Sequence, residues 1–248
     1  MAVQTVFKRY ELKYLLTAGQ KEKVLRAMAE HMQPDAYGAT TIRNLYYDTD
    51  TYLLIRRSME KPAYKEKLRI RSYSRANADS PVFVELKKKY QSVVYKRRLC
   101  LANRDAAQWL EGQKPCGKKT QIAEEIDYVM KLYGSLHPVV FLSYERQAYY
   151  GREDADFRIT FDDTILCRQE DLSLEAAVYG TPILPEGMTL MEIKCSGGIP
   201  LWMTRVLSEE KIYKTSFSKY ATAYAKLIFP QTHDLNAYSM LEVSTNAG

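Results

Sequence analysis

The chain has 248 residues, of which 46% are hydrophobic and 27% charged, and its formal net charge is +6. A chain of this length can bury one substantial core or two small ones, and a modest positive charge suits an anionic partner without requiring one. No run of about 18 apolar residues indicates a membrane-spanning helix. The first residues also lack the pattern of a secretory signal, so we expect a cytoplasmic protein.

The sequence disfavours several common kinds of site. Its four cysteines follow no zinc or redox spacing, and its three histidines are widely scattered, which argues against a histidine-based metal site or a Ser-His nucleophile. Neither GxxxxGK[ST] nor GxGxxG occurs, which argues against a P-loop or a Rossmann nucleotide site. The remaining candidates are charged side chains on the predicted strands.

The first hundred residues are predicted to contain strands and short helices. In chain order they form a strand at 6–15, a helix that a Thr17–Gln20 capping box begins and Pro34 ends, a strand at 42–49, a short helix or turn at 49–58, and strands at 64–73, 82–89 and 93–101. The link between the last two strands is short enough for a hairpin, which predicts antiparallel pairing there.

The second half of the chain adds helices and three further strands. In chain order it is predicted to form a helix from an Asn103 cap to Leu110, an amphipathic helix at 120–134, strands at 139–150, 156–167 and 189–195, and helices at about 201–208 and 217–229. No internal repeat and no linker rich in Pro, Gly or Ser separates these segments. The simplest organisation is one domain over residues 1–230, followed by a weakly ordered tail at 231–248.

One predicted strand carries a basic side chain at every second position. Within YKEKLRIRSY (64–73) these residues are Lys65, Lys67, Arg69 and Arg71, which share one face of the strand. Charged faces recur on the other predicted strands, with these members: Lys13; Glu85, Lys87 and Lys89; Lys96 and Arg98; Arg146; Arg158 and Asp162; Glu192 and Lys194.

Two interpretations of this pattern are open. For any single strand, a solvent-exposed face of an antiparallel sheet is the simpler explanation. Taken together, however, the charged faces lean strongly to Lys and Arg, and cations this dense repel each other unless an anion neutralises them. The joint pattern favours a sheet curled so that its charged face surrounds phosphates, which Arg binds bidentately and Lys as a point charge.

The isolated carboxylates on these faces, above all Glu192, also allow two interpretations. One carboxylate among many cations can hold Mg²⁺ or Mn²⁺, with phosphate oxygens as further ligands. Alternatively, Glu192 only pairs with a neighbouring Lys or Arg. The charge pattern does not decide between the two.

The chain resembles the VTC domain, the polyphosphate polymerase branch of the triphosphate tunnel metalloenzymes. The likeness covers nearly all of 7–229 and rests on the order and spacing of these segments: FKRYELKYLL, IRNLYYDTDTYLLIRR, EKLRIRSY, VFVELKKK, VVYKRRL, FLSYERQAYYG, DFRITFDD, MEIKCSGGIPLW and FSKYATAY. The resemblance implies an α+β fold, in which a closed antiparallel β-barrel of about eight strands forms a tunnel and helices pack outside.

The resemblance also implies roles for individual residues. Those implied to act in catalysis are Arg69, Arg71, Lys87, Arg146 and Arg158. Those implied to bind phosphate elsewhere in the tunnel are Lys13, Lys67, Lys96, Lys194, Lys219, Arg43 and Arg56. Glu192 is implied to hold a divalent metal, Mn²⁺ or Mg²⁺, and Tyr144 to line the same lumen.

The function implied by the resemblance is transfer of the γ-phosphoryl group of ATP to a growing polyphosphate chain, with ATP, inorganic phosphate and polyphosphate as partners. The eukaryotic catalytic members carry PKFSKY before the last helix, whereas KTSFSKY here places Ser216 where they have lysine. This departure bears on turnover more than on phosphate binding. The inositol-phosphate-sensing SPX domain and the membrane segments of those members are also missing from this sequence, which predicts a free-standing, bacterial, cytoplasmic form.

Three other functions remain open. A triphosphatase on the same fold typically shows Glu-x-Glu-x-Lys near its N-terminus, and in RYELK the place of the first carboxylate is taken by Arg9. A non-catalytic polyphosphate-binding module is suggested only by Ser216. Nucleic-acid binding is suggested by the 20 tyrosines and the positive charge, but tyrosines such as Tyr144 and Tyr220 lie at positions better explained by packing, so no nucleic-acid partner is expected.

Overall fold

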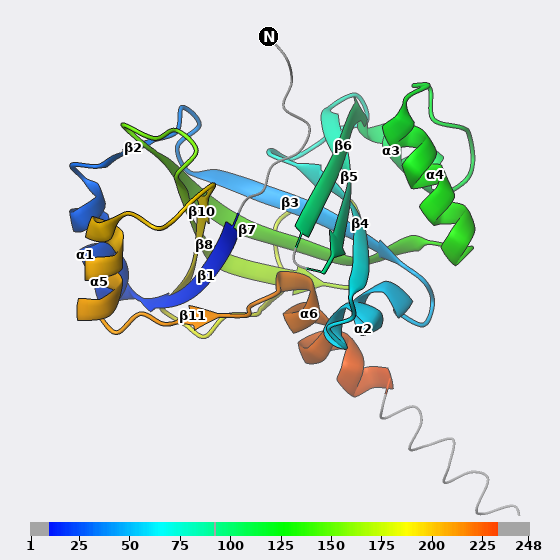
Figure 1. Ribbon diagram of the computed structural model, residues 1–248. Coiled ribbons are helices and arrows are strands. Elements are labelled where there is room, and N and C mark those ends of the chain that lie inside the picture. Colours follow the sequence, from blue (N-terminus) through cyan, green and yellow to red (C-terminus); the bar gives the residue numbers. More distant parts are fainter. Residues whose placement is uncertain (1–9, 92, 233–248) are drawn as a thin grey trace, which may run out of the picture.

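The computed structural model describes residues 10–91 and 93–232, and within them one large antiparallel sheet is surrounded by helices (Figure 1). The strands are β1 (Tyr10–Thr17), β2 (Met32–Pro34), β3 (Thr40–Asp48), β4 (Tyr64–Ser72), β5 (Pro81–Tyr90), β6 (Val93–Ala102), β7 (His137–Gly151), β8 (Arg158–Arg168), β9 (Thr181–Pro182), β10 (Met188–Cys195) and β11 (Lys214–Thr215). The helices are α1 (Ala18–Met28), α2 (Leu53–Met59), α3 (Asn103–Leu110), α4 (Gln121–Tyr133), α5 (Leu201–Glu209) and α6 (Lys219–Ala223), which continues as a π-helix, η1 (Tyr224–Ile228).

The sheet is open, not closed. Its strands follow the order β11-β1-β10-β8-β7-β3-β4-β5-β6, with β2 added to β7 and β9 to β8. The two end strands, β11 and β6, do not pair within the described residues, so the closed barrel of about eight strands implied by the family resemblance is wrong for this chain. The physical reason lies at one edge: β11 contributes only two residues there, which is too few backbone groups for a ladder with β6.

The open sheet is nevertheless strongly curled. In Figure 1, β1, β8 and β10 stand on one side, β4, β5 and β6 on the other, and the long strands β3 and β7 run between them. The curl brings side chains from β1 and β5 into contact, since the Lys87 ammonium lies 3.1 Å from the Glu11 carboxylate. We call the inner side of this curl, which carries Lys13, Arg69 and Arg146, the concave face.

The helices cover the outer side of the sheet and its lower end. Helices α3 and α4 pack apolar side chains such as Trp109 and Ile126 against β4, β5 and β6. Helices α1 and α5 cover β1, β8 and β10, where Val24 and Met203 are fully buried. Helix α6 packs near α2 (Figure 1).

Buried Asp48 attaches the last helix to the sheet. Its carboxylate accepts hydrogen bonds from the backbone N–H groups of Leu54 and Ile55 at the start of α2, and from the Tyr220 hydroxyl of α6 at 2.8 Å. Burial raises the pKa of Asp48, while these hydrogen bonds act in the opposite direction. The segment that leads into α6 is therefore held against the end of β3.

Most predicted elements are found, with changes at their ends. The Thr17–Gln20 capping box is confirmed. Helix α1 ends at Met28, several residues before Pro34. Pro34 itself belongs to β2, which pairs with β7. Asn103 does not cap α3, since its side chain donates to Glu175 instead. Residues 6–9 of the first strand, expected at 6–15, and most of the expected tail, 233–248, lie outside the described residues.

Candidate functional site

The register of the sheet places the charged side chains of seven strands on the concave face. Residues directly opposite each other in an antiparallel pair share a face. Arg69 lies opposite Glu85, which lies opposite Arg98, and Lys13 lies opposite Glu192. The charged concave-face residues are Glu11 and Lys13 on β1, Lys65, Lys67, Arg69 and Arg71 on β4, Glu85, Lys87 and Lys89 on β5, Lys96 and Arg98 on β6, Arg146 on β7, Arg158 and Asp162 on β8, and Glu192 and Lys194 on β10.

Glu85 organises one end of this face. Its side chain is 1% exposed, and four cations surround it, at nitrogen–oxygen distances of 2.7 Å for Arg69, 2.5 Å for Arg98, 2.8 Å for Lys96 and 3.8 Å for Arg71. Burial acts to raise the pKa of Glu85, but these cations outweigh it and hold the pKa far below its ordinary value. The carboxylate is therefore ionised and fixes the guanidinium groups in place.

Arg71 connects this cluster to β3 and β7. Its guanidinium donates to Asn44 Oδ1 at 2.9 Å and to the Tyr144 hydroxyl at 3.1 Å. Burial acts to raise the pKa of Tyr144, but Arg146, Arg71 and Lys219 offset this and lower it to about 8. Tyr144 is thus a phenol stabilised toward its anionic form by three cations.

Asp162 organises the opposite end of the face. It is fully buried, accepts two hydrogen bonds from Arg146 at 2.6 and 2.7 Å, and accepts one from Lys219 at 2.5 Å. Burial acts to raise the pKa of Asp162, but Lys219 and Arg146 lower it overall. The pair of bonds to Arg146 is the planar fork by which guanidinium recognises carboxylate or phosphate.

Lys67 and Lys13 are the cations with the weakest carboxylate contacts at the centre of the concave face. Among the described residues Lys67 makes no ion pair, and Lys13 makes only a long one. Lys67 Nζ donates to Ser218 Oγ at 3.1 Å, and Lys13 Nζ donates to the Phe217 carbonyl at 2.8 Å and lies 4.0 Å from Glu192. Burial, together with the charges of Lys13 and Lys87, lowers the pKa of Lys67 to about 7. Burial likewise lowers the pKa of Lys13 to about 8, although Glu192 opposes this. An anion placed between these lysines would favour their charged forms.

Glu192 fits a metal ion only in part. Its carboxylate is nearly buried, with one oxygen 3.0 Å from Lys194. Burial acts to raise the pKa of Glu192, but Lys194, Lys13 and other nearby cations outweigh it and hold the pKa well below its ordinary value. No group of three or more metal-binding side chains occurs among the described residues. The donor set therefore suits a hard cation such as Mg²⁺ that takes most of its ligands from phosphate and water.

Not all predicted site residues reach the concave face. Arg43 lies on the opposite face of β3, because the concave positions there belong to Asn44 and Tyr46. Arg56 is exposed on α2 and donates to the local Thr51 carbonyl at 3.4 Å. Arg158 does lie on the concave face of β8. It occupies the exposed first position of that strand, however, where it donates to the Ala155 carbonyl at 3.3 Å.

The other predicted residues come together: Lys13, Lys67, Arg69, Arg71, Lys87, Lys96, Arg146, Lys194, Lys219 and Glu192. Glu85, Asp162 and Glu11 hold these cations in place, and Arg98 joins them as a further cation on Glu85. The sequence marked Glu85 and Asp162 only as isolated carboxylates and gave Glu11 and Arg98 no site role. Their signal was a lone acidic or further basic residue at an alternating position.

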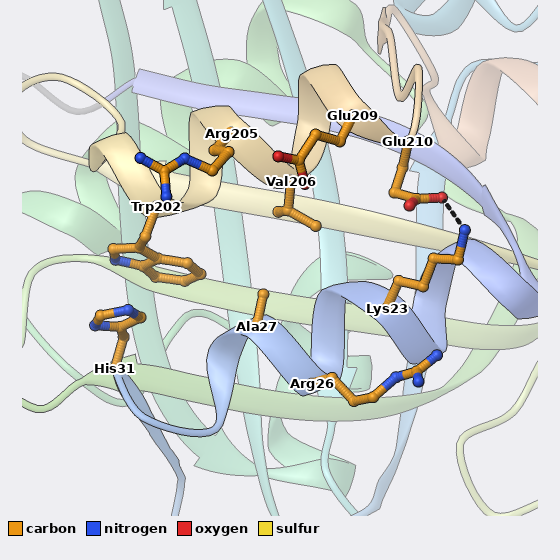
Figure 2. A pocket seen from close by; sticks show the side chains of 9 residues that line it. All are labelled: Lys23, Arg26, Ala27, His31, Trp202, Arg205, Val206, Glu209 and Glu210. Carbon is orange, nitrogen blue, oxygen red and sulfur yellow. Dashed lines mark hydrogen bonds and ion pairs between the residues drawn. The ribbon is translucent and has the colours of Figure 1, made fainter.

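A separate groove of about 380 Å³ lies between α1 and α5 (Figure 2). There the Trp202 ring stacks on His31, with ring centres 4.6 Å apart, and Lys23 pairs with Glu210 at 2.7 Å. These helices cover the outer side of the sheet, and the groove contains none of the predicted site residues. It is therefore distinct from the concave face.

The curled sheet thus gathers cations from seven strands on one concave face. The family model of the VTC domain matches residues 8–228, so this chain belongs to the VTC domain family. In the comparison with curated proteins, none matches. Of the described helices, none combines the length and the apolar character that crossing a lipid bilayer requires.

Two solved structures are similar to this chain at low sequence identity. A candidate adenylate cyclase from Bacillus halodurans is 15% identical, with a TM-score of 0.54, and the match covers 87% of this chain and 96% of that one. A candidate adenylate cyclase from Vibrio parahaemolyticus is 12% identical, with a TM-score of 0.47, and the match covers 88% of this chain and 98% of that one. The first likeness extends over most of both chains and shows that they share a fold.

Proposed function

We propose that this protein is a polyphosphate polymerase, which transfers the γ-phosphoryl group of ATP to the end of a polyphosphate chain on its concave face. The observation that carries the proposal is the gathering of cations from β1, β4, β5, β6 and β7 around space that holds few carboxylates. Lys67, whose nearest charged neighbours are all cations, is its clearest member. Repulsion of this kind is relieved by a polyanion.

The chemistry needs little covalent participation by the protein. In the proposed reaction a terminal oxygen of phosphate or polyphosphate attacks the γ-phosphorus of ATP, the bond to the β-phosphate oxygen breaks, and ADP leaves. Such a transfer depends on positioning and on stabilising the charge of the phosphoryl oxygens. The cations of the concave face are suited to both tasks.

We assign these tasks by position. Arg69 and Arg71, held by Glu85, and Arg146, held by Asp162, would contact phosphate through the guanidinium N–H groups that these ion pairs do not use. Lys13, Lys67 and Lys219 contribute point charges between them. A divalent ion, typical of the family, would be held by Glu192 together with phosphate oxygens and would neutralise and orient the triphosphate.

The first test is incubation of the protein with ATP and Mn²⁺ or Mg²⁺, followed by gel separation of phosphate polymers and assay of free phosphate. We expect a ladder of polymer with release of ADP. An Arg69→Gln variant should lose this activity, whereas Arg205→Gln, which removes an exposed cation from α5 on the outer side, should keep it.

Other outcomes would replace the proposal. Free phosphate without polymer would indicate a triphosphatase. Neither product, combined with tight binding of added polyphosphate, would indicate a binding module and would make Ser216 the first residue to change to lysine.

A further inference from the structure

We infer that Lys65 and Lys89 form an outer subsite, which binds the part of a linear polyphosphate chain that extends beyond the phosphates held by the inner cations. This inference rests on the proposed function and adds the preferred length of its ligand. It starts from the β4–β5 hairpin, where the two residues lie directly opposite each other.

The hairpin contains two successive lysine pairs on the concave face. Lys67 lies opposite Lys87, and one strand repeat further along Lys65 lies opposite Lys89. Like charges directly opposite in an antiparallel pair destabilise it. Neither pair is needed to form a hairpin, so their presence calls for a compensating anion.

The outer face of the same hairpin has the opposite arrangement. There Lys88 lies opposite Glu66 and makes an ion pair with Glu125 at 3.2 Å. Lys87, on the concave face, reaches Glu11. Within the described part of the chain, by contrast, no carboxylate lies at ion-pair distance from Lys65 or Lys89. The unpaired charges are thus confined to one face and one end of the hairpin.

The position of Lys65 extends the inner site in a straight line. Lys65, Lys67, Arg69 and Arg71 alternate along β4, and the six residue steps between the first and the last span about 20 Å. Arg69 and Arg71 contact Glu85, whereas Lys65 Nζ donates to the Ser58 carbonyl of α2 at 3.0 Å. A row of this length exceeds one triphosphate group, so a compact ligand reaches the inner cations and only a longer chain reaches Lys65.

The test compares two ligands, inorganic tripolyphosphate and long-chain polyphosphate, on a Lys65→Gln/Lys89→Gln double variant. Removing two half-exposed charges should weaken long-chain binding by about three- to tenfold and leave tripolyphosphate binding within about twofold. The slope of the logarithm of the long-chain binding constant against the logarithm of the salt concentration should also become shallower by about one to two. Lys88→Gln, on the outer face of the same hairpin, is the matched control and should change neither affinity.

Each result separates the inference from the proposed function. Equal losses for both ligands would place the two lysines in the inner site and overturn the outer subsite, as would no loss for either. If the unmodified protein binds neither ligand, the proposed function fails and the subsite with it. Thermal unfolding without ligand guards against misfolding, because relief of the Lys65–Lys89 repulsion should leave the melting temperature unchanged or higher.

Discussion

Lys87 on β5 and Glu11 on β1 form an ion pair of 3.1 Å between two strands that five other strands separate in the sheet order. The contact shows how far the open sheet curls. Burial acts to raise the pKa of Glu11, but the ammonium of Lys87 outweighs it and the pKa lies below its ordinary value. The sheet is open, because among the described residues no backbone hydrogen bonds join its two end strands, β11 and β6. The Lys87–Glu11 ion pair spans the concave face without them.

Removing this pair should favour anion binding. In Glu11→Gln, Lys87 loses its carboxylate and becomes free for phosphate, so we expect affinity for tripolyphosphate at low salt to rise about two- to fivefold. The free energy of unfolding should fall by no more than about 1 kcal/mol, because the pair is partly exposed. Calorimetric titration measures the first and urea denaturation the second. Glu22→Gln, exposed on α1, is the control, and weaker binding by Glu11→Gln would show that Glu11 itself supports the ligand.

Glu85 should matter far more for stability than other paired carboxylates. Glu85→Gln leaves Arg69, Arg71, Lys96 and Arg98 around a neutral group, so we expect a loss of about 3 kcal/mol or more in the free energy of unfolding. Urea denaturation with an unchanged m-value measures it.

The control and the pH dependence sharpen this prediction. Glu125→Gln, whose pairs with Lys88 and Arg97 lie on the outer side, should cost at most about 1 kcal/mol. Because the pKa of Glu85 is depressed in the folded state, its contribution is present above about pH 5 and is lost as the pH falls below the ordinary value of a glutamate. A Glu85→Gln variant as stable as the original protein would show that the cations repel each other little.

The strands were predictable because their signal is local. Alternation of charged and apolar residues at 64–73, 82–89 and 93–101 predicts β4, β5 and β6 to within one or two residues at each end. Barrel closure was not predictable, because it depends on whether strands far apart in the sequence meet. The two-residue strand β11, which decides that question, has no pattern long enough to detect.

The site was predictable where the strand face was clear. On β4 the cations alternate without a break, so Arg69 and Arg71 were assigned to the same face, as the structure shows. On β3 Arg43 is the only cation, and nothing local says that Asn44 faces the concave side instead. The segment before α6 was also hidden, because Phe217 contributes a backbone carbonyl, which no sequence pattern reveals.

Anion binding should weaken between pH 7 and pH 9. The pKa of Lys67 is lowered to about 7 by burial and by the neighbouring lysines, and that of Lys13 to about 8, so both lose their protons over this range. The unfolded chain retains these protons up to about pH 10, so the free energy of unfolding should rise with pH above 7 even as affinity falls.

Titration of tripolyphosphate at several pH values tests this. Lys67→Arg keeps a cation throughout the range, and we expect its affinity to change less with pH than that of the original protein. An equally steep decline in Lys67→Arg would assign the pH dependence to another group, such as Lys13.

Glu192 provides the test that separates turnover from binding. Glu192→Gln removes the carboxylate best placed for a divalent ion while keeping its shape beside Lys13 and Lys194. We expect metal-dependent polymer formation from ATP to be lost, whereas metal-free binding of tripolyphosphate should be retained or should strengthen about twofold, because a negative charge has left the face. Glu209→Gln, which removes an exposed carboxylate from α5 on the outer side, should keep metal-dependent turnover. Polymer formation by Glu192→Gln at the original rate would show that Glu192 pairs only with its lysines and that the metal assignment is wrong.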